Sequence, residues 1–112
     1  MEQLLKRSDF LRVAKAGHRV VTRAFILQIY QRASEGACRI GFTASRKIGG
    51  AVERNRVKRR LRALARQYLT PLDKPGVDYV LIGRQEALKR KFALMGQDLE
   101  AVLSKWNKLD KS

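Results

Sequence analysis

The feature that most constrains the fold is the segment of residues 45–66, which carries an apolar stripe at helical spacing beside a dense set of cations. The stripe repeats at i, i+4, i+7 and i+11, which places its members on one side of an α-helix. It consists of Val57, Leu61, Leu64 and Tyr68. A glycine pair, Gly49 and Gly50, precedes the pattern and predicts where the helix begins. One side of this helix must pack on the rest of the chain while the other faces outward.

The outward side carries almost no counter-charge. Residues 46–66 hold nine basic side chains against one acid, Glu53, whereas a solvated helix face normally mixes Glu with Lys for i,i+4 pairing. Seven of the nine are arginine, whose planar guanidinium suits phosphate groups. Helical geometry places Asn55, Arg59, Arg62 and Arg66 opposite the stripe, Arg56 and Lys58 at the margins of that face, and Arg54 and Arg60 beside the stripe. We therefore predict that this helix contacts a polyanion.

The composition of the whole chain supports a nucleic-acid partner. Lys and Arg number 25 against 10 Asp and Glu, which gives a net charge of +15 over 112 residues. An apolar content of 45% argues against disorder, and the length fits a single domain over residues 1–112. No apolar run reaches membrane-spanning length, and the first ten residues lack the apolar core of a signal peptide. We expect a cytoplasmic protein with no membrane partner.

No catalytic or metal site is predicted within the chain. One cysteine, Cys38, and one histidine, His18, exclude an internal disulfide and a Cys/His metal cluster. Nothing places the single histidine beside an activated serine, and the carboxylates are scattered rather than paired on one helix face. Glu53, among arginines, is interpreted as a salt-bridge or first-turn residue, and Cys38 as a small buried apolar one. The residues alone indicate a binding protein.

The remaining elements follow from periodicity and turn residues. Ser8 as N-cap, a helix over residues 9–16 and Gly17 at C′ are predicted first. Residues 20–32 and 37–44 read as strands, most economically paired as a hairpin, and residues 77–83 as a strand buried on both faces. A final helix carries an apolar stripe of Phe92, Met95, Leu99, Val102, Leu103 and Trp106. The predicted fold is a two-layer α+β domain in the order α-β-β-α-β-α with a central sheet.

The neighbours of the basic helix favour RNA over duplex DNA. A helix-turn-helix would place a recognition helix after a helical partner, whereas strands flank this one. On the strand of residues 20–32, one face is formed by Phe25, Leu27 and Ile29, and the other by Ile26, Gln28 and Tyr30. Such a face, with an aromatic side chain, is typical of RNA or single-strand binding. A structural ribosomal protein and a DNA-binding regulator remain the alternatives.

The segment Arg54-Asn55-Arg56-Val57-Lys58-Arg59-Arg60-Leu61-Arg62 resembles the "RNR" motif of the bacterial ribonuclease P protein component. The preceding residues 40–49, IGFTASRKIG, resemble the strand and corner that lead into that motif. Asp9 and Phe10, followed by Gly17, Arg23 and Phe25, resemble the first helix and strand of the family. The similarity extends from about Leu4 to Trp106.

The resemblance implies a cofactor protein for a catalytic RNA that removes 5′ leaders from precursor tRNA. It implies a ribosomal-protein-like fold with a mixed sheet and a left-handed β-α-β crossover around the basic helix, against the usual right-handed preference. One protein would bind each RNA subunit, and Mg²⁺ would be held mainly by RNA. The residues that would contact RNA are the corner Ser45, Arg46 and Lys47 and the helix residues Arg54, Asn55, Arg56, Lys58, Arg59 and Arg62, with Arg66 added from the same helix face.

The resemblance also implies a cleft that holds the single-stranded leader. Phe10 and Ile26 match the surface of that cleft, while Ala14 and Gln28 stand where relatives often carry aromatic side chains. Tyr30 shares a strand face with Gln28 and is the candidate to compensate. Core packing is the competing interpretation of Phe10.

Overall fold

The computed structural model describes residues 1–110, and for residues 107–110 it describes the backbone only. A five-stranded mixed sheet runs in the order β1-β4-β5-β3-β2. The strands are β1 (Glu2–Gln3), β2 (His18–Val21), β3 (Phe25–Gln31), β4 (Arg39–Ala44) and β5 (Val77–Gly83). The helices are α1 (Arg7–Ala16), α2 (Ala51–Tyr68) and α3 (Phe92–Asp110), with short 3₁₀ turns η1 (Arg46–Ile48), η2 (Thr70–Leu72) and η3 (Gln85–Leu88).

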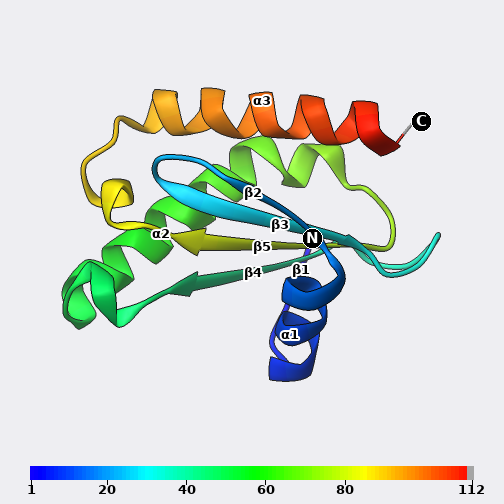
Figure 1. Ribbon diagram of the computed structural model, residues 1–112, viewed down its shortest axis with the longest axis horizontal. Helices are drawn as coiled ribbons and strands as arrows, with labels where there is room; N and C mark the ends of the chain where they lie inside the picture. The colour runs from blue at the N-terminus through cyan, green and yellow to red at the C-terminus, as the bar shows by residue number, and fades with distance from the viewer. Residues whose placement is uncertain (111–112) are drawn as a thin grey trace.

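Helices cover the two faces of the sheet unequally. Figure 1 shows α2 and α3 on one face and α1 on the other. The larger core lies under α2 and α3, where the predicted stripe residues Val57, Leu61 and Leu64 are buried against the sheet. A smaller cluster of Leu4, Val13 and Val80 lies under α1. The predicted α+β class, the basic helix and the last two elements are confirmed.

The strand that comes last in the chain, β5, occupies the middle of the sheet. It pairs antiparallel with β3 over seven residues, Phe25–Gln31 against Val77–Gly83, and parallel with β4 over six. The predicted hairpin between residues 20–32 and 37–44 is therefore wrong, because β5 separates the two segments. The physical reason is burial, since β5 is buried on both faces and is best shielded between two other strands.

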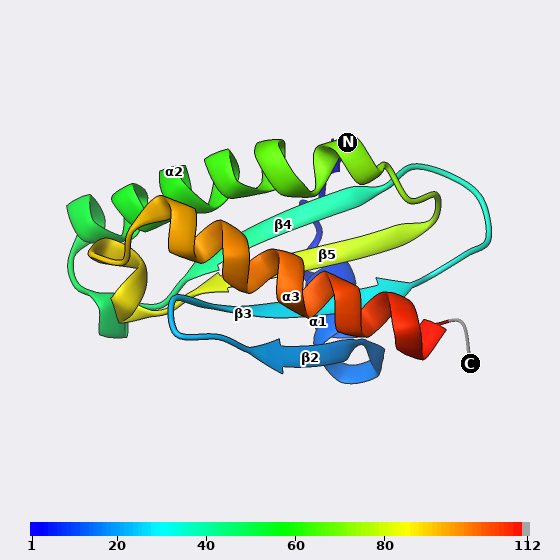
Figure 2. The same cartoon turned by 90° about the horizontal axis from the view of Figure 1, so that it is seen from above.

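The parallel strands β4 and β5 are joined through α2. In Figure 2, which views the sheet from the α2 side, the chain runs along β4, returns through α2 and then enters β5, parallel to β4. With α2 toward the viewer and the strands pointing up, β5 would lie to the left of β4, so the crossover is left-handed. This is the connection that the family resemblance implied, and it is uncommon among β-α-β units. It places the basic helix over β4, near one edge of the sheet.

The predicted strand of residues 20–32 is two strands, β2 and β3, with a tight turn between them. The Thr22 hydroxyl donates to the Phe25 carbonyl oxygen at 2.7 Å, and the Phe25 N–H donates to the Thr22 hydroxyl at 3.2 Å. These side-chain bonds reverse the chain within an otherwise β-prone sequence. The short edge strand β1, beside β4, was not predicted.

Both predicted ends of the first helix require correction. The residue at the N-cap position is Lys6 rather than Ser8, and no side chain caps the helix. Gly17 has φ −79°, so it is not the left-handed C′ residue that was expected. Glycine is required there for space, because a Cβ would lie 2.5 Å from the Val13 carbonyl oxygen and 2.8 Å from that of Ile29.

Candidate nucleic-acid interface

The basic face of α2 is exposed, as its helical spacing predicted. Asn55, Arg56, Arg59, Arg62 and Arg66 are exposed, while Arg54 and Lys58 are half-buried at the margins. The corner residues Ser45, Arg46 and Lys47 are exposed in and beside η1, directly before the helix. Glu53 lies in the first turn of α2, where a carboxylate is favoured by the helix dipole.

Cations on this surface have no acidic partners. None of the eight basic candidates (Arg46, Lys47, Arg54, Arg56, Lys58, Arg59, Arg62 and Arg66) forms an ion pair with a described residue. Arg60, beside the stripe, differs because its guanidinium donates to the carbonyl oxygens of Ala87 and Arg90 and ties α2 to the η3 region. Burial, with a smaller contribution from Arg56, lowers the pKa of Arg60. The unpaired cations need a polyanion to neutralise them, whereas Arg60 is structural.

The opposite face of the sheet carries a groove whose floor follows the strand register. Thr43, Ile82 and Ile26 form one row across β4, β5 and β3, and Gly41, Val80 and Gln28 form the next. The Phe10 ring lies over Gly41, where a Cβ would come within 2.5 Å of the ring carbons. Glycine at this position therefore makes room for the aromatic side chain of α1.

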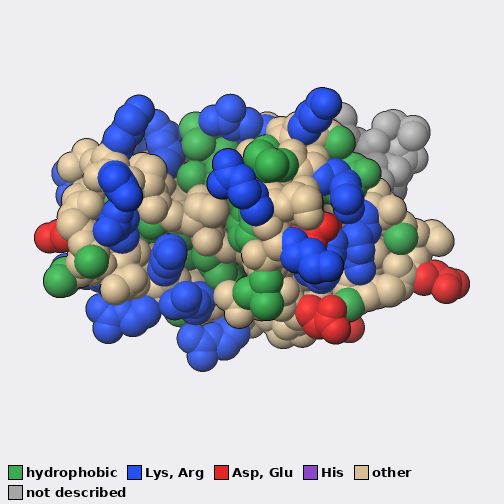
Figure 3. Space-filling model, turned by 90° about the horizontal axis from the view of Figure 1, so that it is seen from below, with side chains coloured by type: hydrophobic (Ala, Val, Ile, Leu, Met, Phe, Trp, Pro, Cys, Tyr) green, Lys and Arg blue, Asp and Glu red, His purple; other side chains and the backbone are tan. Residues whose placement is uncertain are grey.

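Two hollows open along this groove. One of about 310 Å³ is lined by Leu5, Arg7, Phe10 and Thr43. The other, of about 380 Å³, lies between Ile26, Ile82 and the corner residues Ser45 and Lys47. Figure 3 shows this face of the molecule, with Lys and Arg side chains spread among apolar patches. The structure thus brings Phe10, Ile26 and the corner onto one continuous surface.

The other predicted cleft residues lie away from this row. Gln28 is only 7% exposed in the second row, and Tyr30 is half-buried against the cluster under α1. Ala14 is exposed on α1 and lines neither hollow. Thr43 and Ile82 line the hollows but were not predicted as site residues. The alternation of side chains along β4 and β5 was the signal that would have found them.

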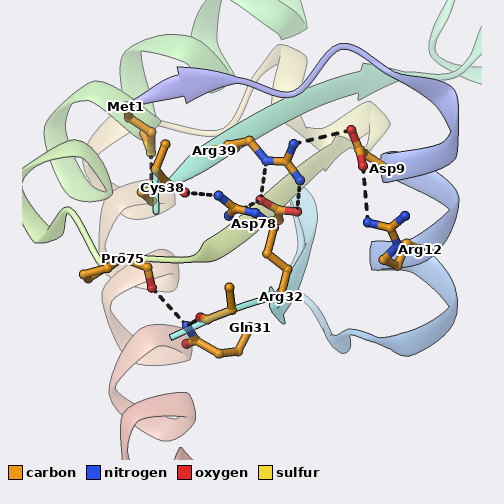
Figure 4. A network of polar contacts seen from close by, with 11 residues as sticks. Met1, Asp9, Arg12, Gln31, Arg32, Cys38, Arg39, Pro75 and Asp78 are labelled. Atoms are coloured by element: carbon orange, nitrogen blue, oxygen red, sulfur yellow. Dashed lines mark hydrogen bonds and ion pairs between the residues drawn. The ribbon is translucent and has the colours of Figure 1, made fainter. Parts of the chain in front are cut away.

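A buried polar network holds α1 against the sheet beside the groove (Figure 4). Asp78, only 1% exposed, accepts hydrogen bonds from Arg39 Nε at 2.8 Å and Nη2 at 2.7 Å and from Arg32 Nη1 at 3.0 Å. Arg39 Nη1 also lies 3.4 Å from Asp9 Oδ2 on α1. The hydrogen bonds to Asp78 raise the pKa of Arg39. These arginines are occupied within the fold, and sequence reasoning missed them because their partner lies about 40 residues away.

The described residues contain no metal centre and no membrane span. No three His, Cys, Asp or Glu side chains among them gather so as to hold a metal ion. No helix in the described part is long and apolar enough to cross a bilayer.

Comparisons with known proteins agree with this geometry. The sequence model of the family described as Ribonuclease P matches residues 1–107. The ribonuclease P protein component of Paramagnetospirillum magneticum is 40% identical over 116 residues, covering 100% of this chain and 87% of its own length. That of Ruegeria pomeroyi is 46% identical over 105 residues, with 91% and 83% covered.

Solved structures give the same result for the fold. The Staphylococcus aureus RNase P protein superposes with a TM-score of 0.76 at 30% identity, covering 93% of this chain and 94% of its own. The RNase P protein from Thermotoga maritima gives 0.75 at 28% identity, with 94% and 97% covered.

Proposed function

The chain belongs to the bacterial ribonuclease P protein family, the protein component of the ribonuclease P holoenzyme, and from that premise we propose that the two faces of its sheet bind different RNAs. The α2 face binds the catalytic RNA subunit. The α1 face binds the 5′ leader of precursor tRNA, so that the protein promotes endonucleolytic removal of the leader during tRNA maturation.

The single observation that carries the first part is the lack of acidic partners around α2. Eight cations stand on α2 and its preceding corner without an ion pair among the described residues. Like charges at this spacing repel one another, so phosphates that neutralise them stabilise the complex. The RNA-contacting set that we propose is Ser45, Arg46, Lys47, Arg54, Asn55, Arg56, Lys58, Arg59, Arg62 and Arg66.

The groove under α1 supports the second part. Phe10 offers an aromatic surface beside the row of Thr43, Ile82 and Ile26, and a base stacks on such a surface without regard to its identity. The groove leads to Lys47 at the corner, which supplies positive charge for the leader backbone. Ala14, Gln28 and Tyr30 remain peripheral candidates because they lie outside the open row.

Among the residues that the structure describes, no group of His, Cys, Asp and Glu side chains fits a metal site. Magnesium is therefore expected to be held mainly by the RNA subunit. The protein alone is expected to cleave nothing, and one protein per RNA subunit is expected to suffice.

The test compares two pairs of variants in the reconstituted holoenzyme. Arg59→Ala and Arg62→Ala should weaken assembly with the RNA subunit while leaving the melting temperature nearly unchanged, because both side chains are exposed. Phe10→Ala and Ile26→Ala should weaken binding of precursor tRNA by roughly tenfold to a hundredfold and leave mature tRNA unaffected, since mature tRNA has no leader.

Matched controls separate binding from folding. Leu11 is 56% exposed on α1 outside the groove, so Leu11→Ala should change neither affinity. Leu94, 37% exposed on α3 on the other face of the sheet, serves the same purpose for Ile26. Equal losses for precursor and mature tRNA, with a large drop in melting temperature for Phe10→Ala alone, would assign Phe10 to the core and overturn the leader proposal.

A further inference from the structure

A third hollow lies between α2 and the outer edge of the sheet, on the face opposite the groove. It has a volume of about 230 Å³, with an apolar floor of Ile40, Phe42 and Ala65, a rim of Arg62, Arg66 and Thr70, and Met1 and Gln3 on the β1 side. Small-molecule pockets usually span about 300–1,000 Å³, so this hollow suits something smaller, such as one planar ring. Its combination of an apolar floor and cationic rim distinguishes it from the rest of the basic face.

A guanidinium lies over an aromatic ring in this hollow. The Arg62 guanidinium carbon lies 5.8 Å from the centre of the Phe42 ring. Phe42 is only half-buried, and neither Arg62 nor Arg66 forms an ion pair with a described residue. Unpaired RNA bases stack on aromatic rings and on arginine planes, and this site offers both.

The edge of β4 beside the hollow is only partly covered. β1 pairs with β4 at Arg39 and Ile40, and the last backbone bond between them runs from the Leu4 N–H to the Ile40 carbonyl at 2.7 Å. Beyond that point no described strand covers the outer side of β4. An uncovered strand edge presents backbone donors and acceptors, which are suited to the hydrogen-bonding edge of a base.

We propose that this hollow receives a single unpaired nucleobase of the catalytic RNA, stacked against Phe42 and Arg62 with its phosphate on Arg66. The proposal rests on the function assigned to the α2 face and adds a base contact to its phosphate contacts. The leader is disfavoured as the occupant, because α1, which carries Phe10, lies on the opposite face of the sheet from α2 (Figure 1). In this proposal, Arg62 binds RNA through its planar guanidinium group as well as through its charge.

The experiment uses substitutions that keep the charge. Arg62→Lys retains the cation but loses the planar guanidinium, and should weaken RNA-subunit binding roughly tenfold if a base stacks there. Arg59→Lys, the matched comparison on the same exposed face but outside the hollow, loses guanidinium geometry at a phosphate contact but no stacked base, and should cost less than Arg62→Lys. Phe42→Leu keeps an apolar side chain and removes the aromatic ring, and should match Arg62→Lys.

Affinity is measured over a salt series, with melting temperatures alongside. Charge is unchanged in all three variants, so the slope of log affinity against log salt should equal that of the wild type, at about 0.7–0.9 per phosphate contact. Base-specific chemical probing of the RNA subunit should show one unpaired base that the wild-type protein protects and Arg62→Lys exposes.

Three results would overturn the proposal. If Arg62→Lys and Arg59→Lys lower the affinity for the RNA subunit by the same small factor, Arg62 contributes only its charge and no base is stacked on it. Loss of precursor tRNA affinity with RNA-subunit affinity intact would make the leader the occupant. Lost protection at every base at once would indicate a general contact surface. If the proposed function of the α2 face is itself wrong, the result is different: the wild-type protein would bind the RNA subunit weakly and without salt dependence.

Discussion

Arginine serves three purposes in this chain, and its immediate neighbours decide which. Arg39 and Arg32 are bound to a buried carboxylate, Asp78, and stabilise the fold. Arg60 donates to backbone carbonyl oxygens and fixes α2 against the η3 region. Arg59 and Arg62 have no acidic partner among the described residues and remain available to RNA. Counting arginines therefore overstates the binding surface, and only the structure separates the three groups.

The hydroxyl of Tyr79 is buried without a hydrogen-bond partner among the described residues. A buried unsatisfied polar group costs about 1–3 kcal/mol, so Tyr79→Phe should stabilise the protein by about 1 kcal/mol. This corresponds to a rise of about 4 °C in melting temperature for a domain of this size. Calorimetry of the two proteins checks it, and a lower melting temperature for the variant would show that the hydroxyl is satisfied.

Alkaline pH should destabilise the fold through two buried acids. Burial raises the pKa of the Cys38 thiol from its ordinary value of 9.0 and also raises that of the Tyr79 hydroxyl from 10.0. Because both pKa values are higher in the folded than in the unfolded state, their contribution is complete below about pH 9 and is lost as pH rises through the folded values. Urea unfolding at pH 7, 9 and 10.5 should show this decline, and Cys38→Ala with Tyr79→Phe should flatten it.

At the scale of elements, hydrophobic periodicity in the sequence predicted where the helices and strands lie, but it did not predict which strands pair with each other. The stripe of Val57 and Leu61 determined α2, and the apolar run of residues 77–83 determined β5 and its burial. The alternation of apolar and polar side chains assigned each strand residue to a face of the sheet. It did not specify which strand lies next to which, so the hairpin prediction was wrong. The candidate site likewise contains some residues that the sequence predicted and some contacts that it did not. Family resemblance predicted Phe10 and Ile26 as cleft residues, and this stays a prediction. The Arg39–Asp78 contact depends on strand register and has no local sequence signal.

Within the polar network beside α1, Asp78 is expected to contribute most to the stability of the fold. Asp78→Asn leaves Arg39 and Arg32 without their buried counter-charge and should cost about 3 kcal/mol or more. Asp9→Asn should cost less than Asp78→Asn, because its contacts to Arg39 and Arg12 are long, at 3.4 and 3.5 Å, and Arg12 is half-exposed. Urea denaturation of both variants measures the two free energies of unfolding. Equal losses would mean that the network acts as one unit rather than through Asp78.

At the scale of the whole molecule, a net charge of +15 lies unevenly over the surface. Among the described residues, the acids that form ion pairs lie on α1, on β5 and around η3 and α3, and no ion pair involves the α2 face. The family comparisons decide between the ribonuclease P and ribosomal alternatives, which charge alone left open. The assignment of individual residues to RNA contacts stays a prediction.

Self-repulsion of this charge should make stability depend on salt. Raising sodium sulfate or adding a short polyanion should increase the melting temperature, because screening relieves repulsion between the α2 cations. Arg59→Ala should reduce the size of this increase, with only a small change in the melting temperature at low salt. A wild-type melting temperature that is independent of ionic strength would contradict the argument.

The position of β5 in the middle of the sheet has a consequence for synthesis. A ribosome delivers β2, β3, β4 and α2 before it delivers the strand that joins them, so none of the long ladders between β3, β4 and β5 can form until residue 83 has emerged. Until then the basic helix has no complete sheet to pack on, and its apolar stripe stays accessible to chaperones. Nascent chains should therefore gain protease resistance in one late step, and contacts of such long sequence separation should make that step slow compared with helix formation.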